Sequence, residues 1–418
     1  MSKTRNGDAR QQAAAILKRL KQTRLKDSFC CYGTQDRTLI GIGRASSLEL
    51  TKTDTLDAIW SSINSYIEEN TDNYIFGFIG FDPANQLDKL TEDYRQKIDL
   101  FVPEVVIKCD AERCTVERGI ASTDILSATL QPANIAATKT FPETKKTSPI
   151  DIPKLDRTEL RDSYAKSVAC FIEEIHAGTL ERATLARKIN TDRNFDLSRT
   201  FMTDRSRHEC ARSFYFSSEN VSFAGQCPEL LAEGSTKSFT TNKLSGTYSR
   251  NDDLSIAELS SRFQNDERII AEHQSSIFSL EVSLEDIGTV ESTKFQVMEL
   301  PTLLHGWSNF ITRPKEKTTI ADCLRSIFPF GVKPMEQGFK LLAEHEDFCR
   351  GPYYGLVGCI TADGIFSFTQ VLRSAYIDNN SSYLMVGAAI TALSTPELEA
   401  DETHSKLSGL EVFDRVDS

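Results

Sequence analysis

The chain has 418 residues, of which 39% are hydrophobic, and it carries a formal net charge of −12 at pH 7. This length and apolar content suffice for two or three domains, or for one large mixed domain with a substantial core. The negative charge argues against nucleic acid or an anionic membrane surface as a partner, although a few buried cationic side chains can still bind a small anion.

The first 150 residues indicate short helices that alternate with short strands. Apolar side chains recur at helical spacing between Leu56 and Ile67, and the aromatic, glycine-rich stretch at 73–84 is typical of a strand that another backbone approaches closely. A polar stretch at 131–153 lacks periodicity and predicts a linker. We expect helices at 10–25 and 53–69, and strands at 28–50, 73–84, 101–108 and 114–119.

The remaining residues predict an α+β region with long antiparallel strands. Its first helix, 158–176, carries an apolar stripe and ends before Gly178, a residue that favours a helix C-cap. We therefore divide the chain into an N-terminal α/β part, 1–150, and a second region, 151–418. In the second region we expect strands at 183–189, 213–217, 222–224, 294–298, 355–361, 365–375 and 382–391, and helices at 158–176, 256–280, 319–327, 335–345 and 396–410.

Cysteine usage and the N-terminal segment predict a cytoplasmic protein. The ten cysteines include no CxxC pair and no Cys/His cluster at zinc spacing, which favours reduced thiols. The first residues lack the apolar core of a secretory signal. The longest apolar stretch, 383–393, is too short and too interrupted to span a bilayer.

Charged residues near the C-terminus indicate a site for a small anion and a metal ion. Glu399 and Glu402 are three residues apart in a predicted helix, so they lie on one face and can share a hard cation. Glu272 offers a third carboxylate from a separate helix. Arg373, on a predicted strand, presents a planar fork that suits a carboxylate. Together these residues predict an anionic substrate that is bridged to Mg²⁺.

The order of short segments between residues 157 and 410 resembles the chorismate-utilising family, which includes isochorismate, salicylate, anthranilate and aminodeoxychorismate synthases. The strand GFIGFD at 77–82 is similar to one in the salicylate and anthranilate branches. The other matching segments are CPELLAEG at 227–234, LSGT at 244–247, IIAEH at 269–273, MELPTLLH at 298–305, RGPYYGLVG at 350–358, VLRSAY at 371–376 and PELEADETHSKLS at 396–408.

The resemblance implies a fold, a substrate and a set of site residues. The fold is a large antiparallel β-sandwich flanked by helices, and the substrate is chorismate, bound beside Mg²⁺. Glu229 would be the general acid that protonates the departing C4 hydroxyl, a role that needs a carboxyl group of raised proton affinity. The metal would be held by Glu272, Glu399 and Glu402. The substrate would contact Arg373, Tyr353, Lys406, Gly387 and the segment Ser245, Gly246 and Thr247, with His305 and Arg182 beside the ring.

Four features depart from the family pattern. Isochorismate and salicylate synthases have a lysine where this chain has Arg182, and arginine keeps its proton at neutral pH, so it cannot act as a base. Arg182 can still orient water or neutralise a carboxylate. Ser245 replaces an alanine or a lysine, Ala389 replaces a second glycine beside the substrate carboxylate, and the loop at 328–342 is shortened.

The leading prediction is a Mg²⁺-dependent enzyme nearest the salicylate synthase branch. It would convert chorismate to isochorismate, or onward to salicylate and pyruvate, in siderophore or other secondary metabolism. One alternative is an ammonia-using subunit of anthranilate or aminodeoxychorismate synthase type, which would need a glutaminase partner, or another variant chorismate chemistry. A second alternative is a non-catalytic relative that binds a chorismate-like ligand. The clustered carboxylates favour an enzyme, since mutually repelling charges have no structural reason to stay together.

Overall fold

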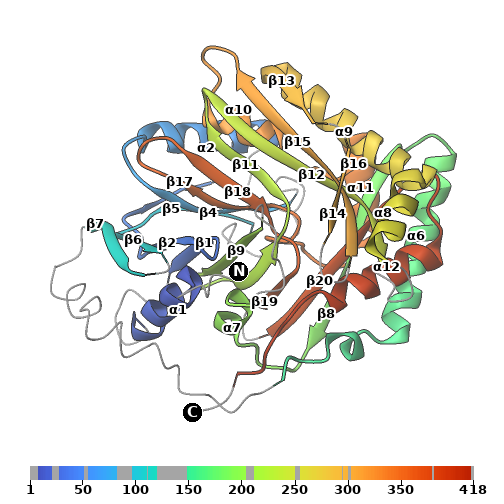
Figure 1. Ribbon diagram of the computed structural model, residues 1–418, viewed down its shortest axis with the longest axis horizontal. Helices are drawn as coiled ribbons and strands as arrows, with labels where there is room; N and C mark the ends of the chain where they lie inside the picture. Colours follow the sequence, from blue (N-terminus) through green and yellow to red (C-terminus); the bar gives the residue numbers. More distant parts are fainter. Residues whose placement is uncertain are drawn as a thin grey trace.

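The computed structural model describes most of the chain in two large sheets and their flanking helices (Figure 1). The described residues are 8–20, 28–50, 55–81, 97–110, 112–119, 148–203, 211–249, 255–293, 295–299, 303–378 and 381–415.

Each sheet has ten strands in the described part of the chain, and the strand pairs there are antiparallel. The first sheet has the order β16 (Val332–Lys333), β8 (Arg182–Thr191), β20 (Ser381–Ile390), β19 (Ser374–Asp378), β10 (Ser222–Cys227), β9 (Arg212–Ser217), β1 (Phe29–Gly33), β2 (Arg37–Ile42), β6 (Val105–Asp110) and β7 (Cys114–Gly119). The second has the order β13 (Gly288–Ser292), β15 (Leu303–Pro314), β12 (Ser238–Ser249), β11 (Leu230–Ser235), β18 (Phe366–Gln370), β17 (Leu356–Ile360), β4 (Ile75–Ile79), β5 (Ile98–Val102) and β3 (Ser46–Ser47), with β14 (Gln296–Glu299) paired to β15.

An aromatic core joins the two sheets. Phe78 of β4 packs edge-to-face on Phe216 of β9 and on Phe223 of β10, with ring centroids 5.0 and 5.4 Å apart. All three rings are fully buried. Such aromatic pairs add to the stabilisation that burial alone provides. The predicted fold, an antiparallel sandwich flanked by helices, is confirmed.

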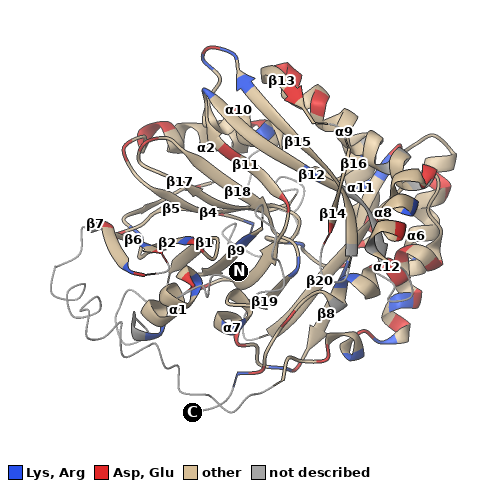
Figure 2. Cartoon of the chain, viewed as in Figure 1, with Lys and Arg blue, Asp and Glu red and all other residues tan. Residues whose placement is uncertain are grey.

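Helices cover the outer faces of the sandwich and one end of it. In Figure 1, α9 lies along β15, while α6 and α12 lie beside β8 and β20. Figure 2 shows acidic and basic segments interspersed on α6, α8 and α12. Within the described ranges, no helix is long and apolar enough to cross a membrane. The helices are α1 (Ala9–Leu20), α2 (Leu56–Glu69), the 3₁₀ helix η4 (Ile152–Leu155), α6 (Thr158–His176), α7 (Leu197–Phe201), α8 (Ile256–Asn265), α9 (Glu267–Ile287), α10 (Ile320–Ser326), α11 (Met335–His345) and α12 (Pro396–Ser408).

Three predicted elements are each divided in two by the structure. The predicted helix 256–280 is α8 and α9, because Asp266 has extended backbone and its carboxylate accepts a hydrogen bond from the amide of Ile269. The predicted strand 365–375 is β18 and β19, which are separated at Arg373, whose φ is +47°. The predicted strand 101–108 is β5 and β6, which part at Pro103, a residue without an amide donor.

Several predicted segments lie partly outside the described residues. The proposed linker, 131–153, is described only from residue 148 onward, where it leads into η4. The predicted helix 10–25 is described to Leu20, and the predicted strand 73–84 to residue 81.

Candidate active site

A cavity of about 370 Å³ lies where the two sheets meet α12 and the segment before α11. This volume is within the usual range for small-molecule sites. It is lined by parts of β8, β12, β15 and β20, by the connections β10–β11 and β18–β19, and by residues 326–333. The structure brings eight of the predicted site residues to this cavity, namely Arg182, Glu229, His305, Tyr353, Arg373, Gly387, Glu402 and Lys406.

Glu229 lies at the turn between β10 and β11 and is buried. Its residue is only 4% exposed, and its backbone carbonyl accepts a hydrogen bond from the Thr369 hydroxyl on β18. One carboxylate oxygen, Oε1, accepts a hydrogen bond from Lys243 Nζ at 2.9 Å. Burial of a charged carboxylate costs free energy unless an opposite charge pairs with it, and Lys243 provides that charge.

Lys243 is a site residue that the sequence analysis missed. It stands on β12, two residues before Ser245 of the LSGT segment, and its side chain is 22% exposed and lines the cavity. Burial opposes its charge, but the attraction of Glu229 outweighs that cost, so the pKa of Lys243 lies above its ordinary value. The sequence contained a signal for Lys243, because side chains alternate along a strand. Thr241 and Lys243 therefore share a face with Ser245, which was a predicted site residue.

Arg373 and His305 form a second pair in the cavity wall. The Arg373 guanidinium donates from NH2 to His305 Nε2 at 2.9 Å. Arginine has no acceptor, so Nε2 must be the acceptor nitrogen of a neutral imidazole. Burial lowers the pKa of Arg373, while the nearby Cys227 and Glu229 act in the opposite direction. The guanidinium remains a cation and lines the cavity, and its residue has left-handed backbone.

Arg182 and Tyr353 add polar groups from two other elements. Arg182 begins β8, and its Nε is buried without a hydrogen-bond partner among the described residues. Burial raises the pKa of Tyr353, so its hydroxyl is a neutral donor. A side chain built at Gly387 would approach that hydroxyl to 3.2 Å and the Leu185 carbonyl to 2.6 Å. Gly387 therefore keeps the backbone of β20 open beside Tyr353.

Helix α12 presents the two predicted metal ligands of the C-terminal segment. Its N-cap is Thr395, whose hydroxyl accepts a hydrogen bond from the amide of Leu398. Glu399 is buried, and Glu402 accepts a hydrogen bond from Lys406, one turn on, at 2.7 Å. Lys406 also donates to the Gly387 carbonyl at 3.0 Å. The helix thus connects the carboxylates to the backbone that lines the cavity.

The donor chemistry of this helix fits Mg²⁺, but the described side chains do not complete a site. Carboxylate oxygens are the ligands that Mg²⁺ prefers. Glu272 lies on α9, and its side chain is outside the described part of the structure. Among the described residues, no three acidic, histidine or cysteine side chains form a group that could hold a metal. The side chains of Ser245, Gly246 and Thr247 likewise lie outside the description, although their backbone pairs β12 with β15.

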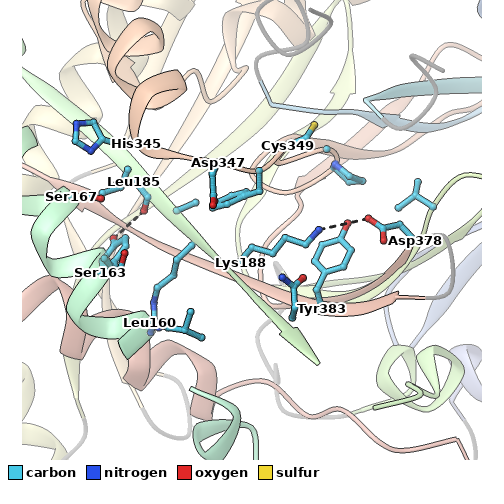
Figure 3. Close-up of a pocket in the computed structure, with 18 residues that line it drawn as sticks. Leu160, Ser163, Ser167, Leu185, Lys188, His345, Asp347, Cys349, Asp378 and Tyr383 are labelled. Carbon is cyan, nitrogen blue, oxygen red and sulfur yellow. Dashed lines mark hydrogen bonds and ion pairs between the residues drawn. The ribbon is translucent and has the colours of Figure 1, made fainter. Parts of the chain in front are cut away.

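A second cavity, of about 550 Å³, contains none of the predicted site residues. It lies between α6, β8 from Leu185 onward, the start of β20 and residues 345–352. Figure 3 shows Lys188 extended toward Tyr383 and Asp378 there. Lys188 Nζ is 3.8 Å from the Tyr383 ring centroid and 3.8 Å from an Asp378 oxygen, so its charge is already partly compensated.

Comparison with known proteins agrees with the sandwich fold. The sequence pattern of the chorismate binding enzymes matches residues 24–411. The fold and this match together mean that the chain belongs to the family of chorismate binding enzymes. The menaquinone-specific isochorismate synthase of Escherichia coli has the same fold, with a TM-score of 0.71, 20% identity, and coverage of 95% of this chain and 90% of that chain.

Curated relatives come from two branches of the family. Anthranilate synthase component 1 of Saccharolobus solfataricus is 27% identical over 266 residues, which cover 61% of this chain and 62% of that protein. Salicylate synthase of Mycolicibacterium paratuberculosis is 28% identical over 289 residues, which cover 64% of this chain and 61% of that protein. The chain thus spans about three fifths of the length of the curated relatives it matches. Neither branch is favoured by these identities.

Proposed function

We propose that this chain is a Mg²⁺-dependent enzyme that converts chorismate to isochorismate, or onward to salicylate and pyruvate. The observation that carries the proposal is a buried Glu229–Lys243 pair beside a cavity whose wall also holds Arg182 and Arg373. The reaction removes the C4 hydroxyl and adds water at C2, so it needs proton exchange next to the ring. It also needs cations around a doubly negative substrate.

Substrate binding in this proposal rests on the cationic and neutral donors of the cavity. Arg373 presents a guanidinium suited to a carboxylate, and Tyr353 presents a neutral hydroxyl. Lys406 holds the Gly387 carbonyl and so fixes the strand that would face the second carboxylate. Mg²⁺, held by Glu272, Glu399 and Glu402, would supply positive charge against a substrate carboxylate.

A second candidate function is the use of ammonia in place of water. Water needs a base before it attacks, and Arg182, at the position of the family lysine, cannot remove a proton. Ammonia is a nucleophile without such help, and anthranilate synthase component 1 is among the matched relatives. This function would need a glutaminase partner to supply ammonia.

The test is incubation of the purified protein with chorismate, with and without Mg²⁺ and ammonium, followed by liquid chromatography and mass spectrometry. Isochorismate or salicylate that forms only with Mg²⁺ is the expected result. An aminated product that requires ammonium would favour the second function. Untouched chorismate under all conditions would overturn both and leave a binding role.

A further inference from the structure

Two cysteines face each other across a hairpin at the margin of the first sheet. Strands β6 and β7 form this hairpin, and β7 is the last strand of the sheet in the described part of the chain (Figure 1). Cys109 of β6 lies opposite Cys114 of β7 in the pairing register. The thiol of Cys114 donates a hydrogen bond to Cys109 Sγ at 2.6 Å. The fold therefore holds these two thiols in contact.

The strand register gives the two cysteines the backbone separation of a disulfide. The Asp110 amide donates to the Arg113 carbonyl at 2.9 Å, so this pair beside the turn is of the hydrogen-bonded type. Such pairs alternate along an antiparallel ladder with non-hydrogen-bonded pairs, whose Cα atoms are about 4.5 Å apart. Cys109 and Cys114 are the next pair, and disulfides join Cα atoms about 4.4–6.8 Å apart. A bond between the two sulfurs therefore requires little movement of the backbone.

Cys31, the neighbouring thiol that acts electrostatically on Cys109, is too distant to bond with it. Cys31 lies on β1, and β2 separates that strand from β6. Neighbouring strands are about 4.7–4.9 Å apart, so two strand spacings exceed the limit of about 7 Å between the Cα atoms of a disulfide. The geometry thus favours the pairing of Cys109 with Cys114.

We propose that Cys109 and Cys114 are a dithiol site that peroxide converts reversibly to a disulfide. Cys114 is partly exposed and Cys109 is buried, so peroxide meets Cys114 first. The hydrogen bond from Cys114 and burial both raise the pKa of Cys109, which keeps the Cys109 sulfur protonated. The resting site is a pair of thiols, in keeping with the reduced cysteines that the sequence predicts.

The oxidation balances in two steps. The Cys114 sulfur attacks one oxygen of hydrogen peroxide, the O–O bond breaks, and the thiol proton joins the leaving hydroxide as water, which leaves a sulfenic acid. The Cys109 sulfur then attacks the Cys114 sulfur, the S–O bond breaks, and the released hydroxide takes the Cys109 proton to form a second water. Two thiols thus lose two electrons to one peroxide. A dithiol reductant restores both thiols by thiol–disulfide exchange.

The disulfide would fasten the last strand of the first sheet to its neighbour. Among the described strands, β7 pairs with β6 alone, and weakly held edge segments open locally at a low cost in free energy. A covalent bond across the hairpin limits that opening. No described residue of the hairpin lines either cavity, so this inference is independent of the proposed function.

Trypsin provides a direct test, because it cleaves after Lys108, Arg113 and Arg118 and so places the two cysteines on separate peptides, 109–113 and 114–118. The full chain is treated with hydrogen peroxide, denatured with an alkylating agent, digested and analysed by mass spectrometry. We expect these two peptides as one linked pair that dithiothreitol separates. Recovery of both peptides with alkylated or sulfinic cysteines, or linkage of either peptide to another cysteine, overturns the proposal.

A matched control tests whether the pair reacts without help from another thiol. Cys170→Ser, at an exposed position of α6, should leave the yield of the linked peptides at the wild-type level. A lower yield would show that Cys170 carries the oxidation, and would overturn the direct route.

Hydrogen exchange measures the effect of the disulfide on β7. The amides of β7 should exchange several-fold more slowly in peroxide-treated wild type than in the reduced protein, because the bond limits local opening. Cys114→Ser cannot form the bond and should show no such slowing on peroxide treatment. Equal exchange in oxidised and reduced wild type, or the same slowing in Cys114→Ser, would overturn the role of the disulfide in holding β7.

Discussion

Arg373 lies at a break between two strands and also lines the cavity. It lies between the end of β18 at Gln370 and the start of β19 at Ser374, and its positive φ costs a non-glycine residue about 1 kcal/mol or more. Its side chain lines the cavity, where His305 Nε2 accepts one of its N–H groups at 2.9 Å. Strained residues cluster at functional sites, so this conformation supports the prediction that Arg373 binds the substrate.

Arg373→Lys should weaken substrate binding although it keeps the charge. Lysine offers a point charge without the fork, so it cannot hold a carboxylate through two parallel hydrogen bonds. Loss of one charge-assisted hydrogen bond costs about 1.5–3 kcal/mol, which corresponds to roughly a 10- to 100-fold rise in KM for chorismate. Steady-state kinetics would measure this KM. Arg313→Lys, at an exposed position of β15, is the matched control, and an unchanged KM in Arg373→Lys would contradict the assignment.

At the scale of elements, the sequence predicted the amphipathic helices and two cavity strands, β8 and β20, but not the other two, β12 and β15. The helices 158–176 and 335–345 lie where the spacing of apolar residues placed them. Strands β11, β12, β13 and β15 were not expected, because residues such as Thr241, Asn242 and Ser308 are polar but fully or almost fully buried. A strand that lines a polar cavity lacks the alternation on which prediction depends. Lys243 was missed because β12 was not expected, and its pairing with Glu229 of the β10–β11 turn follows from the fold.

Helix α12 leads to a prediction about metal binding. If Glu399 and Glu402 hold Mg²⁺, Glu402→Gln should abolish the rise in melting temperature that Mg²⁺ gives in the presence of chorismate, because a ligand stabilises only the state that binds it. Glu397→Gln, an exposed change in the first turn of the same helix, is the control and should keep the rise. A Mg²⁺-dependent rise of wild-type size in Glu402→Gln would refute this ligand. The comparison is made by thermal shift and does not depend on turnover.

The whole molecule is joined across the boundary proposed at residue 150, which itself stays a prediction. Strand β1 pairs with β9 in the first sheet, and β4 pairs with β17 in the second. The packing of Phe78 on Phe216 and Phe223 also crosses that boundary. The N-terminal strands therefore contribute to both sheets. Without them, β9 and β17 would become edge strands with unpaired backbone groups.

A fragment of residues 148–418 should consequently fail to fold cooperatively, although it contains the residues that line the cavity. The fragment lacks β1 and β4, so the backbone edges of β9 and β17 would be exposed. Aromatic side chains would also be exposed, and each large apolar side chain would lose about 1.5–3 kcal/mol of burial free energy. Such losses are comparable to the whole stability of a typical domain, which is about 5–15 kcal/mol. We expect a broad melting transition by circular dichroism and no chorismate-dependent shift, against a sharp transition for the full chain. A sharp, chorismate-responsive transition in the fragment would show that residues 151–418 form the catalytic region by themselves.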